Sequence, residues 1–366
     1  MPRLGQVRAM SGRRISDFLA VWLLVWVFPP ALVDRVIEEC GRGGQRNRLL
    51  PPRTVVYFVL TMCLFPQSSY EEVGRLLAAA AVHVGLVPAA APTPTTAALS
   101  RARARLGADP LRALFNEVTQ RREVYWGEPA DGRRRTVTLD AVVLAVPDST
   151  ENLERFGGPR LRRGGRALPQ VLLVGLADSD TRRVRHAILG SSESQASALA
   201  RASVEGLVPG DVLLAGGIVA DPALVPLIRA TGADVLWRID APVLPVRHPL
   251  PDGTYLSVVG GGTADHNVVR VLDVDSGVAA SAGPSSHLVT SLLDHQAAPR
   301  GDLLARYLRR WTIEDALGAL RPENPPDDQV LRSRWPDGIE QELWGHLLVQ
   351  HAIRKLTPGG MDTRRA

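Results

Sequence analysis

The hydrophobic positions in the first third of the chain recur with the period of an α-helix. In the segment 30–42 the apolar residues fall on one face of a predicted helix, which Gly41 ends. The segment 52–65 is apolar on every side, and this pattern predicts a helix that is buried all round. The helical pattern stops near residue 128. We therefore predict an all-α N-terminal domain over residues 1–128.

Beyond that break the pattern changes to that of β-strands. Residues 136–147 form an apolar run that predicts a buried strand, and further strand patterns follow it. Strand and helix patterns then alternate, which is typical of an α/β domain. Shorter strand-like segments predict a β-rich insertion over about residues 240–295, and a helical pattern returns at 305–321. The second predicted domain covers residues 129–366.

One apolar segment near the N-terminus is open to a second interpretation. The run Phe18–Phe28 follows two arginines, as the apolar part of a secretory signal does. Asp17 directly precedes the run, no small-residue cleavage site follows it, and eleven residues are too few to span a bilayer. We favour a buried helix of a cytoplasmic protein without a membrane partner. An exported or membrane-attached protein is the alternative.

Charge adds a weak indication of the partner. The chain has a formal net charge of +5, and Lys355 is its only lysine, so the positive charge is carried by arginine. Arginine suits bidentate contacts to phosphate, although an arginine-rich chain also arises from a GC-rich genome. Arg101, Arg103 and Arg105 lie close together on a predicted helix. They either face DNA phosphates or form a solvated basic surface.

Two carboxylates are the strongest candidates for chemistry. Asp140 lies in the middle of a predicted buried strand, where an unpaired carboxylate is costly. Far along the chain, Tyr307, Arg310, Glu314 and Arg321 are spaced to share about 60° of one helix face. Two converging carboxylates can form a two-metal site for phosphoryl transfer. The alternative is that each carboxylate pairs separately with an arginine. The cysteines and histidines show no metal-ligand spacing.

These residues occur within motifs that resemble a known family. The stretch "YLRRWTIEDALGALR" is similar to the Tyr–Arg–Glu–Lys signature of the insertion-sequence-four family of bacterial DDE transposases, with Arg321 in the lysine position. The stretch "TVTLDAVVLAVPDSTENLERFG" is similar to the family's first motif and places Asp140 at its first catalytic carboxylate. Segments before residue 128 and around residues 331–356 resemble the family's helical N-terminal domain and C-terminal flank.

The resemblance implies a fold, an activity and a set of roles. The first domain, residues 1–128, would bind DNA. The second domain would be an RNase H-like catalytic domain that carries the β-rich insertion. Asp140 and Glu314 would be catalytic and would bind Mg²⁺, with Mn²⁺ as an alternative ion. Tyr307, Arg310 and Arg321 would hold the DNA backbone. The partners would be double-stranded DNA, as transposon terminal repeats and target, and further copies of the chain in a synaptic complex. The reaction would be DNA cleavage and strand transfer.

The chain also departs from the family's pattern. The family's second catalytic aspartate ends a strand, and Gly216 occupies that position in "LLAGGIVADPAL". Asp211 begins the same predicted strand and Asp221 begins the next helix, so neither replaces it. The chain also stops soon after "HAIRKL", which suggests truncation. The alternative function is therefore a catalytically dead, DNA-binding remnant of a transposase.

Overall fold

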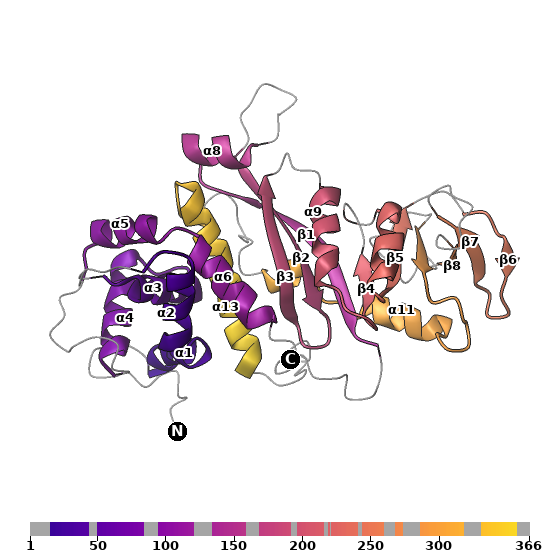
Figure 1. The fold of residues 1–366 in the computed structure, drawn as a ribbon, viewed down its shortest axis with the longest axis horizontal. Helices are drawn as coiled ribbons and strands as arrows, with labels where there is room; N and C mark the ends of the chain where they lie inside the picture. The colour runs from indigo at the N-terminus through magenta and orange to yellow at the C-terminus, as the bar shows by residue number, and fades with distance from the viewer. Residues whose placement is uncertain are drawn as a thin grey trace. The chain divides into compact units, whose positions relative to one another are not determined.

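The computed structural model describes twelve parts of the chain: residues 15–43, 50–83, 94–120, 134–158, 168–191, 196–215, 219, 221–240, 244–259, 268–273, 286–317 and 331–356. Two compact units are distinguished by their internal contacts. The helical unit consists of Met1–Arg121, Val146–Arg155 and Ala319–Pro358. The α/β unit consists of Arg122–Ala145, Phe156–Gly318 and Gly359–Ala366. Figure 1 labels the helices and strands of both units.

The helical unit is built around α3. Its helices are α1 (Ile15–Val27), α2 (Pro30–Glu39), α3 (Pro52–Leu64), α4 (Tyr70–His83), α5 (Thr96–Leu106), α6 (Asp109–Gln120), most of α8 (Thr150–Phe156) and α13 (Pro336–Leu356). Every residue of α3 from Val55 to Cys63 is buried, because α1, α2, α4, α5 and α13 all pack against it. This confirms the prediction of a helix that is buried all round. In α2 the buried residues lie on one face, and the chain turns after it at Gly41, which has a φ of 67°.

The C-terminal helix α13 belongs to the helical unit, although it lies more than 200 residues after α6 in the chain. It packs against α3, α6, α1 and α5, and Figure 1 shows it beside α6. The segment 146–155 also joins this unit, where Asn152 donates hydrogen bonds to the carbonyl oxygens of Pro147 and Ser333. The division therefore differs from the predicted limits of 1–128 and 129–366, since distant segments complete the helical core.

Arg103 on α5 is fully buried, with an exposed fraction of 0%. Its guanidinium lies 3.2 Å from the carboxylate of Glu342 on α13 and donates hydrogen bonds to Gln341, Ser333 and the carbonyl of Gly338. Burial of a guanidinium is tolerated because these groups satisfy its donors. The expectation that Arg103 faces phosphates or solvent is therefore wrong. Arg101 and Arg105, on the same helix, are exposed.

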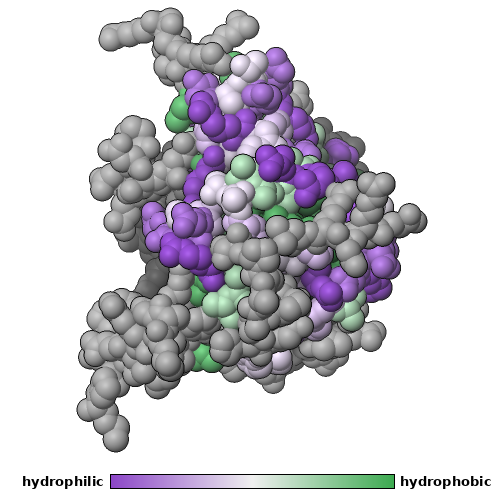
Figure 2. Space-filling view, turned by 90° about the vertical axis from the view of Figure 1, so that its left-hand side faces the viewer, coloured by the Kyte–Doolittle hydropathy of each residue, from purple (hydrophilic) through white to green (hydrophobic). Residues whose placement is uncertain are grey.

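The apolar segment near the N-terminus forms α1, but it is only partly buried. Val21, Leu24 and Val27 are buried, whereas Trp22 and Trp26 are about half exposed, at 52% and 48%. The prediction of a buried helix is corrected to a helix with one buried and one exposed face. Among the described residues, only α1 and α2 taken together reach the length and hydropathy of a membrane span, and a bend of 57° separates them. Among the side chains coloured by hydropathy in Figure 2, hydrophilic ones predominate, with smaller hydrophobic areas between them.

The α/β unit contains a nine-stranded sheet with the order β3-β2-β1-β4-β5-β9-β8-β7-β6. Its strands are β1 (Thr136–Ala145), β2 (Gln170–Asp178), β3 (Arg183–Ser191), β4 (Val212–Ala215), β5 (Asp234–Asp240), β6 (His248–Pro249), β7 (Tyr255–Val258), β8 (Val268–Asp273) and β9 (Ser286–Thr290). β1, β4 and β5 run parallel to one another, and all other neighbours are antiparallel. The segment predicted as a β-rich insertion forms β6 to β9, which extend the sheet from β5.

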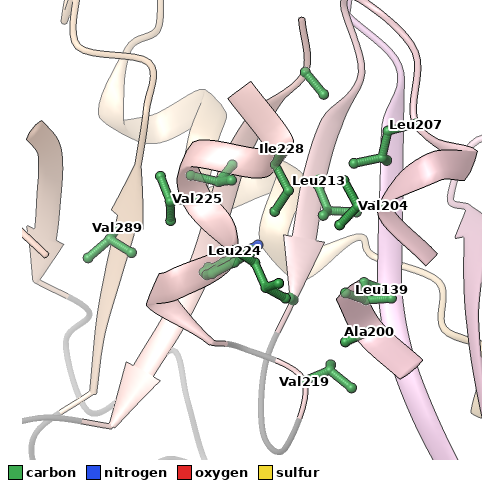
Figure 3. Close-up of a cluster of buried hydrophobic side chains, with 14 of the residues drawn as sticks. Leu139, Ala200, Val204, Leu207, Leu213, Val219, Leu224, Val225, Ile228 and Val289 are labelled. Atoms are coloured by element: carbon green, nitrogen blue, oxygen red, sulfur yellow. The ribbon is translucent and has the colours of Figure 1, made fainter. Parts of the chain in front are cut away.

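The two faces of this sheet are covered by different helices. On one face Leu139 and Leu213 pack against α9 (Ala196–Ser203), the 3₁₀ turns Val204–Gly206 and Pro222–Leu224, and α10 (Val225–Ala230), as Figure 3 shows. On the other face Val212 and Leu214 pack against Leu303 and Tyr307 of α11 (Arg300–Leu308). Because side chains alternate along a strand, Asp140 lies on the face opposite to Leu139, the face that α11 covers.

Candidate active site

Asp140 lies near the middle of β1, between two other strands of the sheet. It pairs with Gly175 of β2 on one side. On the other side β4 ends at Ala215, which pairs with Leu139, the residue before Asp140. The position of Asp140 in the sheet is therefore central, and its carboxylate is half-buried on the face that carries α11.

The segment that follows α11 reaches the carboxylate of Asp140. The one-turn helix α12 (Ile313–Ala316) packs against β1 and brings Glu314 next to this carboxylate. Burial raises the pKa of Asp140, and the negative charge of Glu314 raises it further. The backbone N–H groups of Ala141 and Glu314 and the positive charge of Arg310 act to lower this pKa. The structure thus brings Asp140, Glu314 and Arg310 together from distant parts of the sequence.

The expected continuous helix over these residues is wrong. α11 ends at Leu308, and α12 begins only at Ile313. Between them Thr312 has an extended backbone, with φ −111° and ψ 167°, and forms a capping box with Asp315. The backbone N–H of Trp311 donates to the hydroxyl of Ser179 at 3.1 Å. The helical pattern is therefore interrupted where this tertiary hydrogen bond and the N-terminal cap of α12 lie.

The break places the predicted stripe residues in different surroundings. Tyr307 packs into the core beneath α11 and is buried. Arg310 is exposed, and its guanidinium carbon lies 4.3 Å from the centroid of the Tyr307 ring. Arg310 also donates a hydrogen bond of 3.1 Å to the carbonyl of Tyr307. Stacking and this hydrogen bond restrict the guanidinium near the carboxylates. Arg321 lies outside the described residues.

The region of the expected second carboxylate is only partly described. Gly216 directly follows Ala215 in the sequence and lies outside the described residues. Asp211 precedes β4 and accepts hydrogen bonds from Arg185, at 3.0 Å, and from the backbone of Val208. Asp221 caps the 3₁₀ turn Pro222–Leu224. The prediction that neither aspartate replaces the missing carboxylate agrees with these structural roles.

The site fits one divalent cation in part. Asp140 and Glu314 supply carboxylate oxygens, which hard cations prefer, and a cation between them would offset their mutual repulsion. Among the residues that the structure describes, no group of three or more histidine, cysteine, aspartate or glutamate side chains could hold a metal ion. Two carboxylates are fewer than a two-metal site requires.

Sequence reasoning missed residues that shape this site. Ser179 lies in the turn between β2 and β3 and contacts both β1 and Trp311. Gly175 pairs with Asp140, and a Cβ atom at this position would lie 2.6 Å from Cδ1 of Ile313 in α12. A glycine inside an apolar strand was a signal of such a close approach. The serine carried no signal in the sequence alone.

Comparison with known proteins agrees with the motifs. Residues 19–116 match the family model of the insertion element 4 transposase N-terminal region, which corresponds to α1 to α6. The chain is 25% identical over 348 residues to the transposase InsG for insertion sequence element IS4 of Escherichia coli (strain K12). That alignment covers 89% of this chain and 74% of InsG. The chain resembles the IS4 transposases. This resemblance supports an insertion-sequence transposase function.

A solved structure is more distantly similar. It is the cryo-EM structure of a piggyBac transposase synaptic complex with hairpin DNA. The alignment covers 95% of this chain and 78% of the chain in that structure. The TM-score is 0.43 and the sequence identity is 9%. At this distance the alignment does not by itself establish a common fold, so the resemblance to IS4 transposases rests on the sequence comparisons.

Proposed function

We propose that this protein is the transposase of an insertion sequence and that its chemistry is centred on Asp140 and Glu314. The observation that carries this proposal is the packing of α12 against β1, which brings Glu314 next to the carboxylate of Asp140. It joins the two motif residues that the resemblance to IS4 transposases marks as catalytic, although 174 positions separate them in the sequence.

We further propose that the α/β unit is RNase H-like. The order β3-β2-β1-β4-β5, with three antiparallel strands followed by two parallel ones, supports this assignment. So does the chain that returns through α11 and α12 to the middle of β1. Catalytic residues on a central strand and on a returning helix can converge without being close in sequence.

Asp140 and Glu314 would hold a divalent cation, with Mg²⁺ as the natural ion and Mn²⁺ as a substitute. The chemistry that such an ion supplies when bound is activation of the attacking oxygen and offset of negative charge on the phosphate. The protein's own contribution is to fix the two carboxylates. The backbone N–H groups of Ala141 and Glu314 stabilise the charged form of Asp140, and the capping box of α12 fixes the turn that bears Glu314.

The exposed guanidinium of Arg310 would bind a DNA phosphate next to the carboxylates. Stacking on Tyr307 and the hydrogen bond to its carbonyl restrain the guanidinium, and guanidinium N–H donors match phosphate oxygens. The role of Arg321 as a second phosphate contact remains a prediction from the motif. Binding of terminal repeats and target DNA by several copies, and action in the cytoplasm, also remain predictions from the resemblance.

The second candidate function is that of a DNA-binding protein without catalysis. Gly216 favours it, because the second ion of a two-metal site would lack an anionic ligand. In this case the chain would still recognise transposon ends, and the two functions differ only in chemistry on DNA.

Cleavage and binding of double-stranded DNA with the element's terminal repeats separate these functions. We expect the protein to bind DNA. The logarithm of its affinity should fall linearly with the logarithm of the salt concentration, with a slope of about −0.9 for each phosphate that the protein neutralises. We also expect weak or no nicking with Mg²⁺ and more nicking with Mn²⁺. Efficient cutting with Mg²⁺ would exclude the non-catalytic function, whereas a failure to bind at low salt would contradict both.

A further inference from the structure

The turn between β2 and β3 is held by its own hydrogen bonds. The buried carboxylate oxygen Oδ1 of Asp178 accepts from the backbone N–H groups of Asp180 and Thr181 and from the hydroxyl of Thr181. The backbone N–H of Ser179 donates to the carbonyl of Thr136 on β1 at 3.0 Å. The conformation of this turn therefore does not depend on the Ser179 hydroxyl.

The hydroxyl of Ser179 instead connects two other elements. It lies 3.1 Å from the hydroxyl of Thr138, which shares with Asp140 one face of β1. It also accepts the hydrogen bond from the backbone N–H of Trp311 at 3.1 Å. One side chain thus joins β1 to the non-helical segment between α11 and α12.

Trp311 lies only three residues before Glu314, and the intervening chain is tightly held. Thr312 and Asp315 cap α12 reciprocally, with hydrogen bonds of 2.9 to 3.1 Å. Ile313 is fully buried and lies over Gly175, the strand partner of Asp140. A hydrogen bond at Trp311 therefore constrains the position of α12, and with it that of Glu314, against β1.

We propose that Ser179 is a positioning residue whose hydroxyl holds the turn bearing Glu314 against β1, so that the carboxylates of Glu314 and Asp140 converge. The catalytic meaning of this role rests on the proposed function. The positioning itself concerns contacts within the α/β unit, and it can be measured without DNA or metal.

Amide hydrogen exchange, resolved by NMR on the full chain, tests this role. In Ser179→Ala the amides of Trp311 and Glu314 should exchange about fivefold faster, as expected for the loss of one hydrogen bond that restrains a local opening. Ser179→Thr keeps the hydroxyl and should restore slow exchange at both amides. Ser203→Ala is the matched control, since its hydroxyl bonds to the carbonyl of Leu199 in α9, away from this segment.

Two results would overturn the proposal. Unchanged exchange at Glu314 in Ser179→Ala would show that α12 is positioned without the hydroxyl. Equal acceleration throughout β1 and β4 would show general destabilisation instead of positioning. If Ser179→Ala does not fold, Thr138→Val removes the hydroxyl's other partner and should also accelerate exchange at Glu314. A protein that neither binds nor cuts DNA would contradict the proposed function but leave these exchange results unaffected.

Discussion

Asp140 carries a carboxylate on a strand that is otherwise mainly apolar. Burying its charge at neutral pH lowers the free energy of unfolding. Burial raises its pKa, so the folded protein binds this proton more tightly than the unfolded chain does. Its contribution to stability therefore falls as pH rises from the ordinary aspartate value of about 3.9 through the raised pKa. A residue kept at such a position is expected to serve function instead of stability.

The first prediction is that Asp140→Asn raises the melting temperature at neutral pH. The amide removes the buried charge, and this gain should disappear once pH falls below the ordinary aspartate pKa. Thermal unfolding as a function of pH measures both effects. Asp294→Asn is a control that should lower the melting temperature at neutral pH. Hydrogen bonds from the backbone of Gln296 and Ala297 lower the pKa of Asp294, so its charged form stabilises the fold. A lower melting temperature for Asp140→Asn would show that the carboxylate is stabilising.

The second prediction concerns Gly216, which follows the last residue of β4. Gly216→Asp adds a carboxylate directly after β4, the strand that pairs with β1, and it should restore some nicking of terminal-repeat DNA, first with Mn²⁺. Gly301→Asp is the matched control, since a side chain at this position in α11 meets open space and cannot complete the site. Equal nicking by both variants would show that the added carboxylate does not act at the site.

At the scale of elements, contacts between distant segments decide which helices form one unit. α5 and α13 are joined by the buried pair of Arg103 and Glu342, whose side chains have exposed fractions of 0% and 1%. Gln341 adds hydrogen bonds from its amide group to the carbonyls of Arg103 and Gly107. These polar contacts satisfy the carbonyls at the end of α5 and fix the register of the two helices.

The third prediction is that Arg103→Met destabilises the helical unit by about 3–5 kcal/mol, because it leaves the carboxylate of Glu342 buried without its partner. Urea unfolding followed by circular dichroism measures this change. Arg101→Met alters an exposed arginine on the same helix and should change the free energy of unfolding by at most about 0.5 kcal/mol. Similar losses for the two variants would contradict a special role for the buried pair.

At the scale of the whole molecule, three separate segments of the chain form the helical unit, and the strands of the sheet lie between these segments in the sequence. The N-terminal helices alone therefore lack part of their core. Leu343, Trp344, Leu347 and Leu348 of α13 are all buried in this unit. Their removal would expose the apolar surfaces of the helices that contact α13.

The fourth prediction is that a chain ending at residue 330 loses the stable fold of its helical unit. Without α13, the buried faces of α3 and α6 become exposed, and their amides should lose protection from hydrogen exchange. A chain ending at residue 358 keeps α13 and is the matched control, with protection equal to that of the full chain. Undiminished protection of α3 in the shorter chain would show that α1 to α6 fold by themselves.

The sequence by itself determined the local elements and the residues that are able to take part in catalysis. Apolar periodicity predicted the buried helix α3 and most strands of the sheet, because burial on one or all sides leaves a repeating pattern. The motifs identified Asp140 and Glu314 as candidates, and Gly216 as a departure. These features are local in sequence, so no knowledge of distant contacts was needed.

Only the tertiary structure decided where those elements meet. Arg103 is buried because Glu342, 239 positions later, satisfies its charge, and nothing in the sequence of α5 marks this difference from Arg101. The helical stripe of Tyr307 and Glu314 is broken between α11 and α12. There the hydroxyl of Ser179, from another part of the sheet, accepts the N–H of Trp311, and Thr312 caps α12. Side-chain periodicity reports which face is buried, whereas hydrogen bonds between distant residues determine what lies against that face.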